Sequence, residues 1–299
     1  MQCGHLKPAW RGESGAKSFP RKLLWQWGHS ISNALLGAVS ATSPPYLRVP
    51  SGSRPSVAPV PEEWSERAVA EFVGAFTLIF AGVGAIALGA DLTGVALAHG
   101  LAIAVMVSAV GHISGGHFNP AITFGFLVTR RIKPMLAGIY WVAQLAGALA
   151  AALLAKWLFP GDALGSGVPS VHVISSFEAA VLEAILTFFL VWVVFASAAD
   201  PRGSFKSVAG LAIGLTITMD IFAGGRLTGA AMNPARAFGP QLAGGHWANG
   251  WVWYAGPLVG AAVAALAYEW LYLRPLRPEP VGPAETGVRE PRPGDAATS

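Results

Sequence analysis

Long apolar runs, separated by short polar or glycine-rich stretches, fill the middle of the 299-residue chain. Six of these runs are close to the roughly 20 residues that an α-helix needs to cross the hydrocarbon core of a bilayer. They cover residues 67–89, 94–113, 135–157, 177–199, 207–222 and 250–272. The pattern therefore predicts an all-α membrane protein with six transmembrane helices.

Two shorter apolar segments follow the second and fifth runs, and each begins with the triplet Asn-Pro-Ala. The triplets are Asn119, Pro120 and Ala121, and Asn233, Pro234 and Ala235. Asn is a favoured N-cap and Pro is favoured at the first helical position. Each triplet therefore predicts the start of a short helix, over residues 119–129 and 233–243. Neither helix is long enough to span a bilayer, so we expect two re-entrant half-helices.

Each half of the chain thus contains three spans and one half-helix. Because an odd number of crossings separates the halves, they insert in opposite directions, as in the inverted repeats whose broken helices mark a transport site. We expect the first repeat over residues 64–160 and the second over 161–274. Residues 1–63, which could alternatively lie upstream of the true start, and residues 275–299 are predicted to be disordered tails.

Basic residues gather on one predicted side of the membrane, which places both termini in the cytoplasm by the positive-inside rule. The residues are Arg130, Arg131, Lys133, Arg202, Lys206, Arg274 and Arg277. We expect a multi-pass integral protein of the cell membrane.

Composition supports the membrane assignment and excludes several other classes. Hydrophobic residues make up 53% of the chain and charged residues 12%, against about 25% charged in soluble domains. The net charge of +4 is spread over tails and loops, which gives no support for nucleic-acid binding. A single Cys and the lack of zinc-type or nucleotide-binding motifs predict no metal, no cofactor and no enzymatic activity.

The paired Asn-Pro-Ala triplets, with Arg236 directly after the second, resemble the aquaporin (major intrinsic protein) family over about residues 66–273. This resemblance implies an aquaporin-like fold, a homotetramer, and a passive channel for water and small neutral solutes that excludes protons and cations. It also implies that backbone carbonyls line the pore. These belong to Gly115, Gly116 and His117, and to Gly229, Ala230 and Ala231.

The resemblance further implies a selectivity filter made of His99, Ile221, Ala230 and Arg236. Such a set is similar to the filters of plant tonoplast intrinsic proteins. Isoleucine in place of an imidazole makes one side of the filter wider and less polar, which favours ammonia as a second permeant. The permanent charge of Arg236 repels cations and its donors bind neutral solutes. His172 is a further candidate at the pore mouth.

Three further features lie inside the spans. Glu71 and Glu183 occupy comparable places in spans one and four, where ionisable residues are costly. They suit either a proton relay or, as we favour, acceptors for backbone N–H groups of the broken segments. Asp220 has no assigned role, although Arg226 and Arg236 are candidate partners. Small residues predict close helix crossings, at Gly138, Gly147, Gly210, Gly214, Gly256 and Gly260.

Other functions compete with the water channel. A glycerol or urea facilitator is one alternative, although Ala237 and the pair Trp253-Tyr254 argue for the water-channel side. An ion-coupled secondary transporter is another, since it shares inverted repeats and broken helices. It would need a carboxylate at mid-membrane, where the triplets carry neutral Asn119 and Asn233. A membrane protein with a closed pore is the third.

Overall fold

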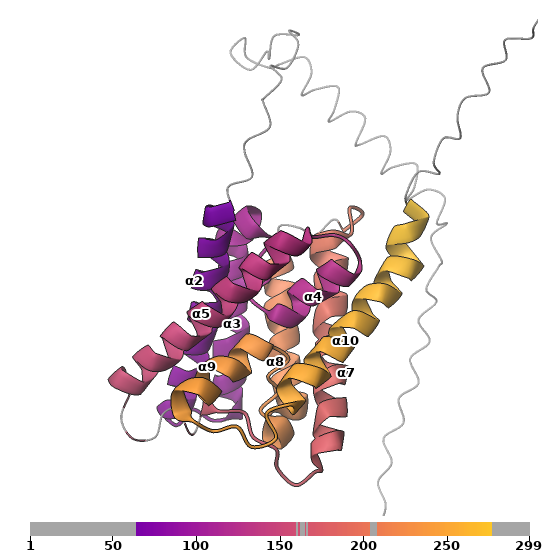
Figure 1. Ribbon diagram of the computed structural model, residues 1–299. Helices are drawn as coiled ribbons and strands as arrows, with labels where there is room; N and C mark the ends of the chain where they lie inside the picture. Colours follow the sequence, from indigo (N-terminus) through magenta and orange to yellow (C-terminus); the bar gives the residue numbers. More distant parts are fainter. Residues whose placement is uncertain (1–63, 160, 162–164, 166, 204–207, 277–299) are drawn as a thin grey trace, which may run out of the picture. The chain divides into compact units, whose positions relative to one another are not determined.

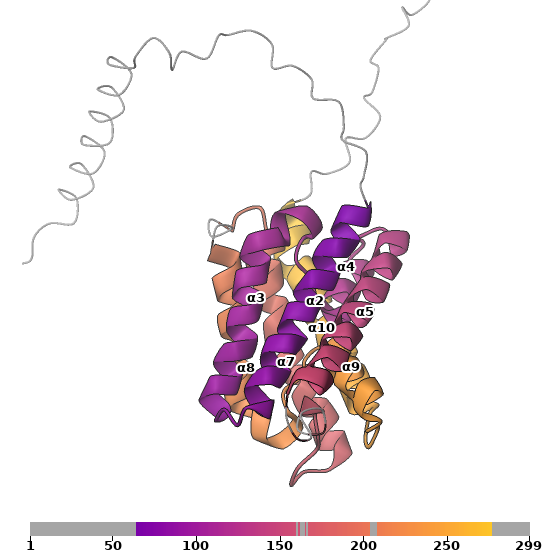
Figure 2. The ribbon, with the colours of Figure 1, turned by 90° about the vertical axis from the view of Figure 1, so that its left-hand side faces the viewer.

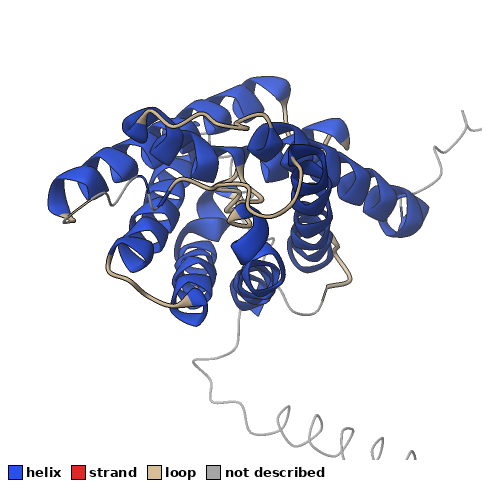
Figure 3. Cartoon of the chain, turned by 90° about the horizontal axis from the view of Figure 1, so that it is seen from below, coloured by secondary structure: helices blue, strands red, loops and turns tan. Residues whose placement is uncertain are grey.

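The computed structural model describes residues 64–276, except for 160, 162–164, 166 and 204–207. The expectations for the tails 1–63 and 277–299 lie outside these residues. Within the described part of the chain all regular structure is helical (Figure 3). The long helices are α2 (Trp64–Ala87), α3 (Leu92–Ser114), α5 (Pro134–Leu158), α7 (Ser176–Val194), α8 (Ala209–Thr228) and α10 (Val252–Tyr268).

Two short helices, α4 (Pro120–Val128) and α9 (Pro234–Gly244), follow α3 and α8 (Figure 1). Wider π-helical turns continue two of the long helices, with η2 (Phe195–Ala199) after α7 and η4 (Glu269–Leu273) after α10. A 3₁₀ turn, η5 (Arg274–Leu276), ends the described chain. The order of three long helices with one half-helix, given twice, is the predicted one.

Within the described residues, six helices are long and apolar enough to cross a membrane. Each contains most of one predicted span, so the prediction of six transmembrane helices is confirmed. The fifth span was predicted to end at residue 222, but α8 continues to Thr228. Two glycines, Gly224 and Gly225, lie inside this extension. A Cβ at Gly224 would lie 2.6 Å from the Cδ1 atom of Leu186 on α7, so the glycine lets this side chain pack against α8. The helix ends only at Gly229, which takes a left-handed φ of 80°.

Two helix pairs, α2 with α5 and α7 with α10, pack extensively. In each pair a glycine of one helix lies against a backbone carbonyl of the other. A Cβ at Gly147 of α5 would collide with the carbonyl oxygen of Phe72 on α2. A Cβ at Gly260 of α10 would collide with the carbonyl oxygen of Ala184 on α7. Small residues let helix backbones approach closely where hydrophobic attraction between helices is weak. These two crossings were predicted from sequence.

Gly138 behaves differently from the other glycines predicted at crossings. A Cβ added there would have no atom within 4 Å, so Gly138 faces open space instead of a neighbouring helix. The close approach of α5 to α2 lies more than two turns further on, at Gly147. Sequence could not distinguish the two positions, because a glycine that allows contact and one that leaves a gap look alike.

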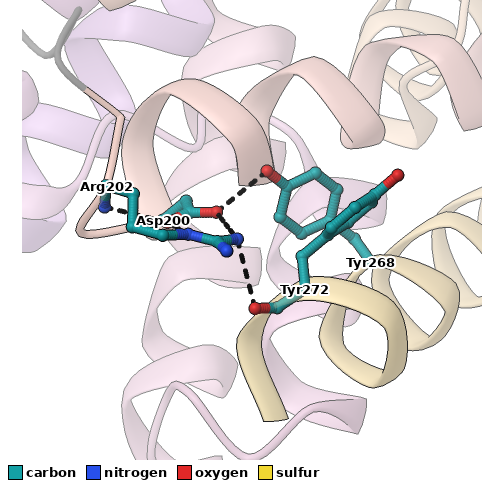
Figure 4. A network of polar contacts seen from close by, with 4 residues as sticks. All are labelled: Asp200, Arg202, Tyr268 and Tyr272. Carbon is teal, nitrogen blue, oxygen red and sulfur yellow. Dashed lines mark hydrogen bonds and ion pairs between the residues drawn. The ribbon is translucent and has the colours of Figure 1, made fainter. Parts of the chain in front are cut away.

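A polar cluster joins the π-helical ends of α7 and α10 (Figure 4). The Arg202 guanidinium donates to Oδ1 and Oδ2 of Asp200 at 3.0 and 2.7 Å and to the Tyr272 carbonyl at 3.1 Å. The Tyr268 hydroxyl donates to Asp200 Oδ2 at 3.1 Å. Hydrogen bonds from Arg202 lower the pKa of Asp200, and the same pairing raises the pKa of Arg202. The loop before α8 is thereby tied to the end of the last span.

Candidate pore

Both half-helices start as their sequence predicts. Asn119 is extended, with φ −154°, and its side chain accepts a hydrogen bond from Ala121 N at 2.8 Å. Asn233 is also extended, with φ −149°, and accepts from Ala235 N at 2.9 Å and from Arg236 N at 3.3 Å. Each Asn thus uses its amide oxygen as the helix cap. Its amide nitrogen stays available for other partners.

The two amide nitrogens reach across to the opposite half of the chain. Asn119 Nδ2 donates to the Met232 carbonyl at 2.9 Å, and Asn233 Nδ2 donates to the Phe118 carbonyl at 3.0 Å. The two half-helices therefore meet with their N-termini together, although the two Asn residues lie 114 positions apart in the sequence. An amide nitrogen carries two hydrogens. One N–H of each Asn remains after this bond.

Glu71 and Glu183 hold the loops that precede the half-helices. The carboxylate of Glu183 accepts from Thr228 Oγ1 at 2.7 Å, Ala231 N at 2.9 Å and Met232 N at 2.7 Å. Glu71 makes the equivalent set of bonds in the first half, to Ser114 Oγ at 2.7 Å, His117 N at 2.9 Å and Phe118 N at 2.6 Å. Both glutamates are fully buried. Their bonds satisfy backbone donors that an irregular loop inside a membrane would otherwise leave unpaired.

Aromatic side chains brace the two loops from behind. The Tyr140 hydroxyl on α5 donates to the Ser114 carbonyl, and Trp253 Nε1 on α10 donates to the Thr228 carbonyl at 3.0 Å. The first half has an additional brace, because Gln144 Nε2 donates to Glu71 Oε2 at 2.7 Å. The two repeats therefore brace their loops in the same way, except that Gln144 adds a hydrogen bond in the first half.

A narrow internal cavity runs past these loops. Asn119, Asn233, His99, Ile221, Ala230 and Arg236 are among the residues that line it. Its volume open to the centre of a water molecule is about 20 Å³, little more than the space that one such molecule requires. The cavity thus admits small molecules singly, and the polar residues that line it include Asn119, Asn233, His99, His117 and Arg236.

Three comparisons identify the kind of protein to which this cavity belongs. The family model described as Major intrinsic protein matches residues 61–268. Aquaporin TIP2-1 of Zea mays is 45% identical over 212 residues, covering 67% of this chain and 84% of its own length. Aquaporin TIP1-2 of Zea mays is 44% identical over 221 residues, covering 70% and 87%. The chain belongs to the major intrinsic protein family.

The fold agrees with a solved structure of the same family. The X-ray structure of the aquaglyceroporin from Plasmodium falciparum superposes with a TM-score of 0.61 at 27% identity, covering 71% of this chain and 98% of that one. The prediction of an aquaporin-like fold is therefore confirmed. As a member of this family the protein is a membrane channel and not an enzyme.

The four residues predicted to form the filter lie together in the channel. Arg236 is buried, and its Nη1 donates to the Gly167 carbonyl at 2.7 Å, which fixes the guanidinium beside the lumen. His99 is buried and its Nδ1 lies 2.8 Å from the Val95 carbonyl. Since a carbonyl only accepts, Nδ1 carries a proton and donates. Ile221 and Ala230 are buried beside the same cavity.

His172 lies at a wider mouth outside the filter. A second cavity of about 210 Å³ is lined by His172, Ser170, Ile221 and Arg236, among other residues. The backbone N–H of His172 donates to the Leu227 carbonyl at 2.8 Å, which holds this loop over the end of α8. The imidazole is exposed. The structure thus places His172 at the entrance and in contact with the same vestibule as two filter residues.

Asp220 has neither of its predicted partners. Among the described residues its two carboxylate oxygens make no hydrogen bond, although the side chain is 1% exposed. The described structure shows no ion pair from it to Arg226 or Arg236. Nothing in the channel explains this placement.

Two residues that matter to the filter were missed in the sequence. A Cβ at Gly82 of α2 would collide with the ring of His99, so Gly82 provides the space that this imidazole occupies. The Gly167 carbonyl is the partner of Arg236. Neither residue has a local signature, because each acts only through a side chain on another helix. For Gly82, the sequence offers only its closeness to a second glycine, Gly84.

Proposed function

We propose that the protein is a passive water channel that also conducts ammonia and excludes protons and cations. The observation that supports this most directly is the set of His99, Ile221, Ala230 and Arg236 around one narrow cavity. Water and ammonia are similar in size and in hydrogen bonding, so a filter that admits one and is widened by Ile221 suits both.

Selection against cations rests on two features of the lumen. The guanidinium of Arg236 carries a permanent charge and is held by Gly167, so it repels cations wherever they enter the filter. The N-termini of α4 and α9 meet at the two Asn residues, and each helix end carries about half a positive charge. Protons and metal ions therefore meet two positive barriers in series.

Selection against proton transfer depends on the remaining N–H group of each Asn. A water molecule at mid-membrane that accepts from Asn119 and Asn233 has both of its lone pairs occupied. It therefore donates a hydrogen to the water on either side and accepts from neither. The carbonyls of the loops 115–117 and 229–231 then accept from water on either side. This arrangement of donors and acceptors interrupts a hydrogen-bonded proton wire. Glu71 and Glu183 serve as anchors of these loops, because backbone and side-chain donors occupy their oxygens.

The assembly and location follow from the same reasoning. We infer a homotetramer in which each subunit carries its own pore, made of two repeats over residues 64–160 and 161–274, with both termini in the cytoplasm. A location in the cell membrane is still a prediction from sequence. The relatives carry the TIP designation and do not support it, and microscopy of the tagged full chain in its own cells would decide.

The test is stopped-flow light scattering on proteoliposomes, with osmotic shrinkage and ammonia-driven internal alkalinisation measured in parallel. We expect both to be fast. Ile221→His places an imidazole in the filter and should reduce ammonia flux more than water flux. Met219→His, two residues earlier on the exposed face of α8, is the matched control and should change neither. Fast shrinkage without alkalinisation in the wild type would refute the ammonia proposal. Glycerol flux comparable to water flux would favour the facilitator alternative.

A second variant examines the donors at mid-membrane. Asn233→Asp replaces the amide nitrogen that donates to the Phe118 carbonyl with an oxygen that cannot donate when ionised. We expect lost water permeability or a cation leak, measured as conductance across a planar bilayer. Unchanged water flux with no conductance would contradict the donor role of this amide.

A further inference from the structure

An apolar groove lies on the outer surface of the bundle, between the first halves of α2 and α5. The two helices stand side by side and begin at the same end of the bundle (Figure 2). Its ten lining residues carry neither a charge nor a hydroxyl, and its volume is about 910 Å³. The residues are Ala68, Val69, Phe72, Pro134, Met135, Gly138, Ile139, Val142, Ala143 and Ala146.

The groove exists because α5 and α2 touch at one close crossing and diverge from it towards the start of α5. The backbones touch where Gly147 meets Phe72. Towards the start of α5 they separate, and Gly138 adds no side chain to fill the gap. Met135 and Val142 stand on the groove at 65% and 70% exposure. The groove is therefore a built feature of the helix pair, open along its length and closed at its inner end.

Its length matches one leaflet of a membrane. The lining residues of α5 run from Pro134 to Ala146, and twelve steps of 1.5 Å give about 18 Å. Half of a hydrocarbon core is about 15 Å. Because the crossing at Gly147 ends the groove near mid-membrane, a helix of a second copy that spanned both leaflets would lose contact half-way. An acyl chain of one leaflet ends where the groove ends.

The outer end of the groove is positively charged. Pro134 and Met135 follow directly on a basic segment that contains Arg130, Arg131 and Lys133. Arg131 is paired with Glu269 at 2.7 Å. Arg130 is exposed, and the described structure shows no hydrogen bond or ion pair from its guanidinium. The described basic residues near the starts of α2 and α5 also include Arg67, while the carboxylates there include Glu66 and Glu269.

We propose that this groove binds an anionic phospholipid, with one acyl chain between α2 and α5 and the phosphate held by Arg130 and Lys133. A phospholipid fits both parts of this site. Its negative headgroup lies at the membrane surface, beside the basic residues, and its apolar chain is one leaflet long, like the groove. The site lies on the outside of the bundle and contains no residue of the pore. The lipid would therefore bind without entering the path of water.

Native mass spectrometry of the purified full chain tests the proposal, with phosphatidylglycerol and phosphatidylcholine of identical acyl chains as probes. The wild type should retain phosphatidylglycerol preferentially. The double variant Arg130→Gln/Lys133→Gln should lose this preference, by about fivefold for each cation removed. Arg226→Gln, an exposed cation on α8 at the opposite end of the bundle, is the charge control and should keep it.

Filling the groove tests the place of the acyl chain. Gly138→Leu has room for its side chain and should lower retention of both lipids, while osmotic water permeability stays at the wild-type value. Val263→Phe, at a half-exposed position on α10, adds bulk elsewhere and should change neither. If Gly138→Leu lowers the yield of folded protein, Met135→Gln makes the groove mouth polar at nearly constant size and should have the same effect on lipid.

Three outcomes would overturn the proposal. The first is equal retention of the two lipids by the wild type. The second is unchanged phosphatidylglycerol retention in both the double variant and Gly138→Leu. The third is a changed number of subunits in Gly138→Leu, which would mean that a second copy of the chain covers the groove.

Discussion

Replacing Glu183 by glutamine tests whether its carboxylate anchors the loop before α9 or carries a proton. In the wild type one carboxylate oxygen accepts from Thr228 Oγ1 and Ala231 N, and the other accepts from Met232 N at 2.7 Å. Glutamine keeps one oxygen but turns an NH₂ group towards either Met232 N or the other two donors. At least one buried N–H is then left without an acceptor and faces another donor.

The size of the effect follows from the bonds that change. A hydrogen bond to a charged group contributes about 1.5–3 kcal/mol, and an unpaired buried donor costs about 1–3 kcal/mol. A loss of about 2–4 kcal/mol corresponds to a fall in melting temperature of roughly 5–15 °C for a domain of this size. Because the strained loop includes Ala230 of the filter, we expect water permeability per molecule to fall as well.

Thermal unfolding in detergent and stopped-flow shrinkage of proteoliposomes measure the two effects. Glu71→Gln tests the symmetry-related anchor and should behave similarly, since Glu71 also accepts from two backbone N–H groups. If Glu183→Gln kept both its melting temperature and its water flux, the carboxylate would have to be protonated in the wild type. The anchoring role would then be refuted and the proton relay would return as a candidate.

Two further predictions follow from contacts that the sequence did not reveal. Gly82→Ala forces a methyl group against the His99 ring, so we expect an altered ratio of ammonia to water flux at a stability cost of about 1–3 kcal/mol. Gly138→Ala is the control in open space, and an unchanged ratio in Gly82→Ala would contradict the seating of His99. Asp200→Asn should lower the melting temperature by a few degrees between about pH 8 and about pH 5, because Arg202 holds the pKa of Asp200 below its ordinary value of 3.8. The carboxylate stabilises the folded state above its unfolded-state pKa, so the difference from wild type should vanish as the pH falls through the depressed pKa. A difference that grew on acidification would refute this.

The sequence predicted whatever depends on local signals or on chain order. Asn and Pro at the half-helix starts act on their own neighbours, so α4 and α9 begin at Pro120 and Pro234 as expected. The filter residues were located by motif spacing, and they line one cavity, while their roles are still predictions. Contacts between distant helices could not be predicted. Gly138 and Gly147 look alike in the sequence, but one opens a groove and the other makes a crossing. The extension of α8 to Thr228 was missed because Gly224 and Gly225 resemble a helix end in the sequence. The contact of Gly224 with Leu186 on α7 is visible only in the structure.

The hydrogen bonds of the central loops explain why neither half of the chain can build the pore alone. Each loop is anchored by a glutamate of its own half, and each Asn side chain bonds a carbonyl of the other half. The carbonyls of Phe118 and Met232 belong to the same residues whose N–H groups the glutamates accept. A change at Glu71 therefore shifts Phe118, and through it Asn233, which caps the opposite half-helix. The position of one Asn in the lumen is thus set by the glutamate of the other repeat, so a defect in either anchor disturbs both donors.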